Sequence, residues 1–448
     1  MGNEWKIVPT GDLCTGIYDG PHATPKKTND GPIFLGISNL SQGRIDLSNT
    51  EHLSEEDFVK WTRRITPQPG DVVFSYETRL GEVGLIPEGL KCCLGRRMAL
   101  MRPNPSKADS RFLLYAYLSP EFQATIRART IHGSTVDRIP LIEFPSFPIR
   151  VPPLHEQKTI AHILGTLDDK IELNQQTNQT LEAIARALFK SWFIDFDPVR
   201  AKMDGRQPAG MDAETAALFP AEFEDGGAIG QIPKGWEVKT LGDFIDIKHG
   251  YAFKGEFFRD TPPGDILLTP GNFAIGGGFK DDKFKYYVGE IPEEFVLAKG
   301  NLVVTMTDLS KLGDTLGYPA IIPTERESHY LHNQRLGKVF IKSKNSISKL
   351  HLYYLLRTNE YRHEILAGAT GTTVKHTSPN RIQAFKFPAP DAELSLKFAE
   401  IVGFLFEKMS LNNDENRNLI VTRDALLPKL LSGEIRVKDA EKIVEAVV

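Results

Sequence analysis

Apolar residues recur with steps of four and three along a stretch that we predict to be helical, from His155 to about Phe189. The positions on this stripe are Ile160, Leu164, Leu167, Ile171, Asn174, Asn178, Leu181, Ala185 and Leu188. Such spacing is typical of the inward-facing positions of a coiled coil. Two successive positions carry asparagine, so the predicted stripe has two polar layers.

A second stripe with the same spacing begins 238 residues later. Its positions are Phe398, Val402, Leu405, Met409, Asn412, Asn416, Leu419, Arg423 and Leu426. The two helices therefore either pack together or occupy equivalent places. Buried asparagines at such positions fix the register of paired helices at some cost in stability; the alternative is that the helices splay there and the amides are solvated.

Short motifs outside the helices also recur in the same order. The first copies are Trp5, Pro69 to Val73, Leu80-Gly81, Gly95 to Met98 and Gly133 to Val136. The second copies are Trp236, Lys299 to Val303, Leu312-Gly313, Asn333 to Leu336 and Gly371 to Val374. A repeat of this length is too long for a solenoid unit, so we interpret the chain as a duplicated module of one domain followed by one helix.

Within the first module the local pattern predicts mixed helix and strand. Strands are expected at 33–37, 71–75, 83–86 and 98–101, a helix at 112–118 that is interrupted or restarted at Ser119-Pro120, and an extended, proline-rich stretch at 144–153. The stretch from 199 to 232 is expected to be a linker with some local order.

Composition narrows the class of protein. With 448 residues, 41% of them hydrophobic and 25% charged, the chain has room for two or three globular domains. The formal net charge of −4 means that a nucleic-acid surface would have to be local or completed by a partner. The three cysteines form no CxxC pair, and no apolar run approaches the ~20 residues of a membrane span. We therefore expect a cytoplasmic protein.

Motifs for catalysis are not found in the sequence. His155-Glu156 is not followed by the second histidine of HExxH, and the glycines at 276–278 are not followed by Lys-Ser or Lys-Thr. A nuclease-like set of Asp71, Glu77 and Arg79 is disfavoured because Asn301 replaces the aspartate in the second copy. We predict no catalytic, cofactor-binding or metal-binding residue in this chain.

What both modules retain is a set of hydrogen-bond donors beside glycines and strand ends. Arginine suits guanine, glutamine suits adenine, and hydroxyls next to a glycine can approach a phosphate. Our candidate DNA-contacting residues are Tyr76, Thr78, Arg79, Arg96, Arg97, Ser134, Thr135, Thr305, Thr307, Lys311, Gln334, Arg335, Thr372, Thr373, Lys375 and His376. Each alone also fits an ordinary surface residue; their recurrence carries the prediction.

Four motifs resemble the specificity subunit of type I restriction-modification systems. They are Pro152-Pro153-Leu154 with Gln157, the Leu-Asp-Asp-Lys-Ile run at 167–171, Leu188 to Phe193, and Leu427 to Ile435. The resemblance covers essentially the whole chain. It implies an α+β fold with a pseudo-two-fold internal repeat, in which two similar α/β target recognition domains are separated by two long helices that form an antiparallel coiled coil.

On this resemblance the chain divides into six parts. They are recognition domain 1 at 1–153, long helix 1 at 154–198, a linker at 199–232, recognition domain 2 at 233–390, long helix 2 at 391–435 and a tail at 436–448. About 35 helical residues at ~1.5 Å each span roughly 50 Å, enough to hold two readers a duplex turn of ~34 Å or somewhat more apart.

The resemblance also implies partners: double-stranded DNA, two modification subunits that carry S-adenosylmethionine chemistry, and restriction subunits that use ATP and Mg²⁺. The chain itself would bind no cofactor. Two other functions stay open at this stage, a self-contained enzyme acting on DNA and a free-standing regulator that binds a bipartite operator.

Arg423 breaks the second stripe, where the first has Ala185. We expect the second helix to leave the coiled coil there, freeing Leu426, Leu427 and Leu430 either for a modification subunit or for a fold-back onto the first domain.

Overall fold

The structure is a computed structural model that describes residues 5–323, 328–343 and 346–448. It divides into two compact units. The first unit comprises Met1–Asn174 and Glu415–Val448, and the second comprises Gln175–Asp414. The boundary cuts both long helices, α4 (Leu154–Phe193) and α11 (Ala392–Ser432). Each unit therefore contains one α/β domain and a part of each helix.

The domain of the first unit is built on a four-stranded antiparallel sheet with the order β2-β10-β7-β8. Its strands are β2 (Cys14–Asp19), β10 (Met98–Pro103), β7 (Val72–Ser75) and β8 (Val83–Leu85). The remaining strands are β1 (Lys6–Pro9) with β11 (Pro148–Val151), the sheet β6 (Glu51–Leu53), β3 (Lys27–Leu35) and β9 (Cys92–Leu94), and the hairpin β4 (Leu40–Ser41) and β5 (Arg44–Ile45). The helices are α1 (Glu55–Trp61), α2 (Ser110–Leu118), α3 (Pro120–Arg129) and α12 (Val437–Glu445), with 3₁₀ turns at Thr10–Leu13, Ile37–Asn39 and Phe144–Ser146.

The second unit repeats this plan with the sheet order β15-β24-β20-β22. Its strands are β15 (Ile245–His249), β24 (Leu336–Ile341), β20 (Leu302–Thr305) and β22 (Pro319–Ile321). Around them lie β14 (Glu237–Thr240) with β26 (Lys386–Ala389), a sheet of β16 (Phe258–Arg259), β18 (Lys285–Tyr287), β17 (Asp265–Leu267), β23 (Tyr330–Leu331) and β19 (Val296–Leu297), and the pair β21 (Thr307–Asp308) and β25 (Lys375–His376). The domain's helices are α7 (Leu241–Phe244), α8 (Lys349–Leu355), α9 (Asn359–Ala367) and α10 (Pro379–Gln383), with 3₁₀ turns at Gly227–Ile229, Gly255–Phe257, Pro270–Asn272 and Glu293–Phe295.

The two domains are duplicates at the level of topology. In each, the strand that follows the Arg-containing turn, β10 or β24, lies between the first strand of the sheet and the buried strand that begins at 72 or 302. Each also contains one parallel pair at the same place, β3 with β9 and β17 with β23. The internal repeat predicted from the sequence is therefore a repeat of fold.

The restart predicted at Ser119-Pro120 is present, and its cause is local. Ser119 ends α2 in an extended conformation, and its hydroxyl accepts a hydrogen bond from the Phe122 amide at 3.2 Å, which caps α3. Thr358 caps α9 in the same way through the Tyr361 amide, at 3.3 Å. Proline at the first helical position loses no hydrogen bond because that amide has no intrahelical partner.

Two expectations about extended segments need correction. The stretch 144–153 includes a 3₁₀ turn and then β11, which pairs with β1 from Pro9–Pro148 to Lys6–Val151. Pro148 is tolerated because it occupies the first position of the strand.

The stretch 199–232, expected to be a linker, belongs to the fold of the second unit. Phe219 lies in the core of that unit. The stretch contains most of α5 (Asp197–Met203), α6 (Ala213–Ala217), β12 (Phe223–Asp225) and most of β13 (Gln231–Pro233).

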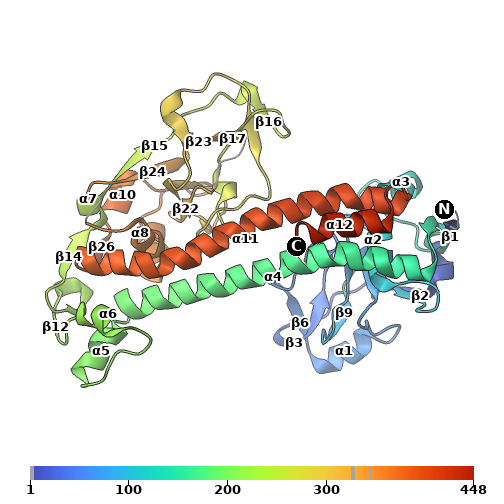
Figure 1. Ribbon diagram of the computed structural model, residues 1–448, viewed down its shortest axis with the longest axis horizontal. Coiled ribbons are helices and arrows are strands. Elements are labelled where there is room, and N and C mark those ends of the chain that lie inside the picture. Colours follow the sequence, from blue (N-terminus) through green and yellow to red (C-terminus); the bar gives the residue numbers. More distant parts are fainter. Residues whose placement is uncertain (1–4, 324–327, 344–345) are drawn as a thin grey trace. The chain divides into compact units, whose positions relative to one another are not determined.

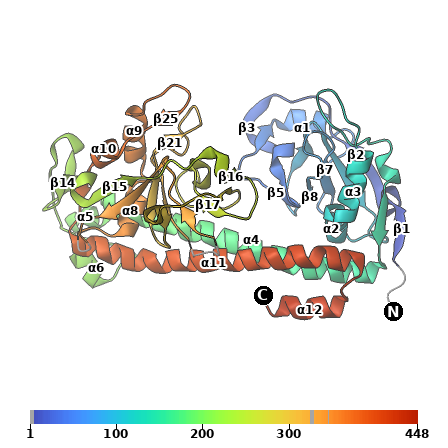
Figure 2. The same ribbon diagram turned by 90° about the horizontal axis from the view of Figure 1, so that it is seen from above.

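Helices α4 and α11 run side by side in both views (Figures 1 and 2), and the asparagine layers pair across them. In the first unit the Asn174 amide donates to Asn416 Oδ1 at 3.0 Å. In the second unit the Asn412 amide donates to Asn178 Oδ1 at 2.8 Å. The lower number on α4 pairs with the higher number on α11, so the helices are antiparallel. Asn174, Asn412 and Asn416 are buried rather than solvated.

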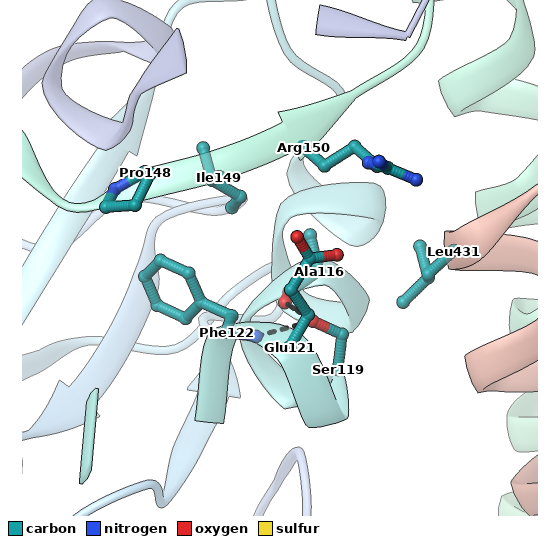
Figure 3. Close-up of a pocket in the computed structure, with 8 residues that line it drawn as sticks. All are labelled: Ala116, Ser119, Glu121, Phe122, Pro148, Ile149, Arg150 and Leu431. Carbon is teal, nitrogen blue, oxygen red and sulfur yellow. Dashed lines mark hydrogen bonds between the residues drawn. The ribbon is translucent and has the colours of Figure 1, made fainter. Parts of the chain in front are cut away.

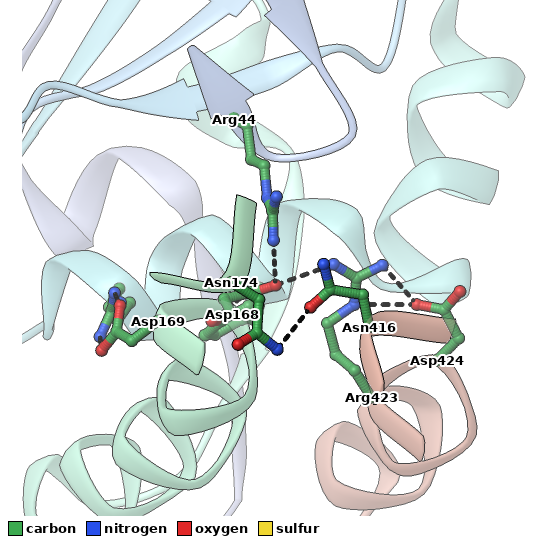
Figure 4. Close-up of polar contacts among 9 residues, drawn as sticks. Arg44, Asp168, Asp169, Asn174, Asn416, Arg423 and Asp424 are labelled. Atoms are coloured by element: carbon green, nitrogen blue, oxygen red, sulfur yellow. Dashed lines mark hydrogen bonds and ion pairs between the residues drawn. The ribbon is translucent and has the colours of Figure 1, made fainter. Parts of the chain in front are cut away.

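The expectation that α11 leaves α4 at Arg423 is wrong. Arg423 Nη1 donates to Asp168 Oδ1 of α4 at 2.8 Å, and its side chain is only 13% exposed. Figure 4 shows the Asp168 carboxylate between Arg423 and Arg44, whose Nη2 lies 3.4 Å away. The Tyr115 hydroxyl also donates to Asp168, at 2.6 Å. A charged residue thus replaces an apolar one because a carboxylate faces it.

The C-terminal leucines fold back onto the first domain, which was one of the two predicted alternatives. Leu426 and Leu430 are buried in the same core cluster as Leu164 of α4. Leu431 faces the corner between α2 and α3, beside a cleft of only about 10 Å³ (Figure 3). Leu427 is partly buried against the same cluster. The predicted tail at 436–448 contains α12, whose Ala440 and Val444 join the same core.

Candidate nucleic-acid interface

Three separate segments of the first domain meet at one place. The first follows β7, the second is the turn at Gly95–Arg97, and the third is the loop at 133–138. The Tyr76 amide donates to the Arg97 carbonyl at 3.1 Å, and the Ile139 amide donates to the Tyr76 carbonyl at 2.8 Å. The Thr78 amide donates to the Asp137 carbonyl at 3.3 Å. The predicted candidates of this domain lie on these three segments.

The second domain builds the same junction. The Met306 amide donates to the Arg335 carbonyl at 2.8 Å, and the Thr377 amide donates to the Met306 carbonyl at 3.0 Å. Thr307 of β21 pairs with His376 of β25, and the Thr307 hydroxyl lies 3.1 Å from His376 Nδ1. The recurrence seen in the sequence is thus a recurrence of hydrogen bonds between corresponding segments.

The turn between β9 and β10 presents one exposed side chain. Gly95 is buried, Arg96 is exposed and Arg97 is half-buried; Asn333, Gln334 and Arg335 follow the same sequence of exposure. A side chain at Gly95 would collide with the Leu35 carbonyl. The glycine thus lets the turn lie close to β3.

Arg97 is held in place by its neighbours. Its Nη1 donates to the Thr78 hydroxyl at 3.1 Å, and its Nε lies 3.3 Å from Glu77 Oε2. Arg97 and Thr78 both have left-handed backbone conformations, with φ of 72° and 71°. Such conformations cost about 1–3 kcal/mol each in residues other than glycine and concentrate at functional sites.

The hydroxyl-bearing loops also share their geometry. A side chain at Gly133 would come within 2.5 Å of the Val136 carbonyl, and one at Gly371 would collide with the Val374 carbonyl. The following hydroxyl residues Ser134, Thr135, Thr372 and Thr373 are all exposed. Lys375 is half-buried and His376 is exposed beside them. Each loop therefore offers hydroxyls and backbone to a ligand at the surface.

Not every candidate side chain reaches the surface. Tyr76, Thr305 and Thr307 are 4%, 0% and 7% exposed. Thr305 belongs to β20, which is buried on both faces, and its hydroxyl donates to the Thr315 carbonyl. Burial also raises the pKa of Tyr76 to about 12. These three residues support the junction from inside and correct our expectation that they offer groups to DNA.

Of the other candidate side chains, some are exposed and some are held by hydrogen bonds within the domain. Thr78 and Lys311 are exposed. Arg79 is tied down instead, because Nη1 donates to the Ile37 carbonyl and Nη2 to Glu82, both at 3.0 Å. Asp71 of the rejected nuclease set is 2% exposed and accepts two hydrogen bonds from Arg102, at 2.9 and 2.7 Å. Its role is structural.

One element of the site was missed from the sequence. A cavity of about 390 Å³ lies beside Arg96 and Arg97, with Ser38 and Asn39 in its lining. Asn39 Oδ1 accepts from the Gly36 amide at 2.9 Å, and its amide donates to the carbonyls of residues 46 and 49. Asn272 makes the corresponding bond to the Thr269 amide, also at 2.9 Å. Comparing the two copies at this asparagine would have found it.

The three cysteines are poor candidates for catalytic nucleophiles. Burial raises the pKa of Cys14, Cys92 and Cys93 to about 12, so their thiolates are not available near neutral pH. Among residues 5–323, 328–343 and 346–448, no group of three or more His, Cys, Asp or Glu side chains is arranged to hold a metal ion. In the same part of the chain no helix is long and apolar enough to cross a membrane.

Two equivalent domains, each with an exposed cluster of donors and each followed by a long helix, define a duplicated recognition protein. A family model described as the type I restriction modification DNA specificity domain matches residues 3–183 and 233–420. The two matches correspond to the two modules. The chain therefore belongs to the family of type I restriction-modification DNA specificity proteins, and the resemblance stated from the sequence motifs is confirmed.

Individual relatives agree with this assignment. The chain is 30% identical over 393 residues to the type I restriction enzyme HindI specificity subunit of Haemophilus influenzae, covering 76% of this chain and 80% of that protein. It is 25% identical over 415 residues to the MjaIX specificity subunit of Methanocaldococcus jannaschii, covering 88% and 86%. The crystal structure of the S subunit of a type I restriction-modification system from M. genitalium has the same fold, with a TM-score of 0.55, 17% identity and coverage of 96% and 97%. The comparisons favour a specificity subunit over a free-standing regulator.

Proposed function

We propose that the two domains of this specificity subunit read the two halves of a split DNA sequence, while α4 and α11 form the frame on which modification subunits assemble. The observation that carries this proposal is the repeated junction of three segments. In each domain its turn presents one exposed donor side chain, Arg96 or Gln334, and a hydroxyl-bearing loop is joined to the same junction. A net charge of −4 is compatible with it because the donors are local.

We propose further that chemistry resides on the partners. S-adenosylmethionine would be bound by the modification subunits, and ATP and Mg²⁺ by restriction subunits. In support, the buried cysteines and the Asp71–Arg102 pair have structural explanations. The complex would act on chromosomal DNA in the cytoplasm.

Docking of two equivalent partners has a candidate position on each helix. Leu173 of α4 and Leu411 of α11 are equivalent in the repeat, each directly precedes a paired asparagine, and each is 57% exposed. A single exposed apolar residue is common on protein surfaces, so the equivalence of these two positions in the repeat is what selects them. These two leucines replace Leu430, which is buried, and Leu427, which is partly buried, as our candidates for the contact with modification subunits.

The test is reconstitution of methyl transfer. The chain alone, the modification subunit alone and the two together are incubated with S-adenosylmethionine and plasmid DNA, and methylated sites are sequenced. We expect methylation of one bipartite motif only with both proteins. Methyl transfer by the chain alone would show that it is an enzyme, and an unchanged motif without the chain would refute its role in recognition.

A further inference from the structure

The two donor turns differ in chemistry at one corresponding position. Arg96 and Gln334 occupy the exposed middle position of turns whose flanking residues are buried on one side and half-buried on the other. Both turns are held by a hydrogen bond from the segment after the buried strand, at 3.1 Å in the first domain and 2.8 Å in the second. Two turns with a common anchor therefore present different side chains at the same position.

Each of these side chains is available for a ligand. Within the described residues, neither the Arg96 guanidinium nor the Gln334 amide makes a hydrogen bond or an ion pair. Arg97, directly beside Arg96, is occupied by Thr78 and Glu77. Of the two arginines that line the cavity of about 390 Å³, only Arg96 therefore has its guanidinium free for a ligand.

The backbone that carries the two side chains is fixed at several points. In the first turn the Gly95 amide donates to the Leu35 carbonyl at 2.7 Å. In the second the Gln334 amide donates to the Tyr251 carbonyl and the Arg335 amide to Asn333 Oδ1, both at 2.9 Å. Because the backbone of the turn is already fixed, binding has to order only the side chain and not the loop, which favours selective recognition over adaptable contact.

We propose that this position sets base identity in each half of the target: Arg96 reads a guanine and Gln334 reads an adenine. The inference rests on the proposed function, DNA reading by both domains. Arginine donates two hydrogen bonds to guanine O6 and N7, whereas glutamine donates to adenine N7 and accepts from its N6 amino group. A phosphate contact by the same side chains is the alternative that the experiment separates.

The experiment uses the complex of the full chain with its modification subunits. It is mixed with a pool of duplexes whose half-site positions are randomised, and the bound fraction is sequenced. For Arg96→Gln we expect one position of one half-site to change its preference from guanine to adenine, with guanine discrimination falling by roughly 5- to 150-fold. For Gln334→Arg we expect the reverse change in the other half-site. Arg63→Gln, an exposed arginine outside the three segments, serves as the control and should change neither.

The outcomes separate the two levels of the proposal. Binding weakened equally for all sequences would assign Arg96 to phosphate and overturn the inference, as would unchanged preferences in both variants. If Arg96→Gln fails to assemble, the wild-type pool still decides: it must show a preferred G·C pair in one half-site and a preferred A·T pair in the other, and the lack of either overturns the inference. A wild-type complex without any sequence preference would refute the proposed function itself.

Discussion

The ion pair between Arg423 and Asp168 should contribute strongly to the stability of the first unit. Their side chains are 13% and 20% exposed, and their atoms are 2.8 Å apart. Nearby, the Tyr115 hydroxyl and Arg44 also face the carboxylate. Burial alone would lower the pKa of Arg423, but the carboxylates of Asp168 and Asp424 together outweigh burial, and the pKa is raised. The interaction therefore favours the charged guanidinium.

The magnitude follows from what Arg423→Ala removes. A hydrogen bond to a charged group contributes about 1.5–3 kcal/mol. Asp168 keeps Tyr115 and Arg44, so it is not left without partners, and we expect a loss of about 2 kcal/mol. The substitution also places at this position the alanine that the first stripe has at Ala185.

Hydrogen–deuterium exchange measured on peptides is the appropriate assay, because a two-unit chain need not unfold in one step. Peptides from the first half of α4 should exchange roughly 30-fold faster in Arg423→Ala, while peptides of the second unit should not change. Asp424→Asn is the matched control: Asp424 also binds Arg423, but it is 60% exposed, so we expect a small effect. Equal acceleration in the two variants, or in both units of Arg423→Ala, would refute the reasoning.

Three further predictions concern other parts of the molecule. His351 is buried and burial lowers its pKa to about 3 from 6.5, so it stabilises the fold only as the neutral form: its contribution is complete above pH ~6.5 and falls by about 1.4 kcal/mol per pH unit below it. The midpoint temperature of unfolding of the second unit should therefore fall as the pH is lowered, and His351→Leu should reduce this dependence on pH. An identical pH dependence in the variant would contradict the prediction. Replacing Leu173 or Leu411 by Asp should weaken binding of modification subunits in pull-down titrations, with both together abolishing it, and undiminished binding would remove these residues from the docking surface. Inserting one heptad in each helix, after Asn178 and before Asn412, preserves the paired seam and should lengthen the non-specific spacer of the methylated motif without changing its half-sites; altered half-sites would show that the helices do not act as the spacer.

The helices and the duplication were predictable because both rest on periodicity. A stripe with steps of four and three predicts a helix and its buried face, and its recurrence located the second copy, including Asn174 and Asn416 as layer positions. What periodicity cannot supply is the residue opposite. Arg423 looked like the end of the seam because nothing in the spacing indicates that Asp168 faces it.

Which segments carry the candidate donors could be read from the sequence, but which of their side chains are exposed could be read only in part. Segments after strand ends and beside glycines were chosen because functional loops gather there. Which hydroxyls point outward depends on whether a strand is covered on one face or two, and β20 is covered on both, so Thr305 is buried. The folded character of 199–232 escaped for a similar reason: Phe219 becomes a core residue only through long-range packing.

The most direct test of the central claim is a map of methylated bases across the genome, made by single-molecule sequencing with and without this chain. The account predicts one motif with two specified halves around a non-specific spacer, present only when the chain is present. Persistence of that motif in cells that lack the chain, or a continuous motif without a spacer, would contradict it.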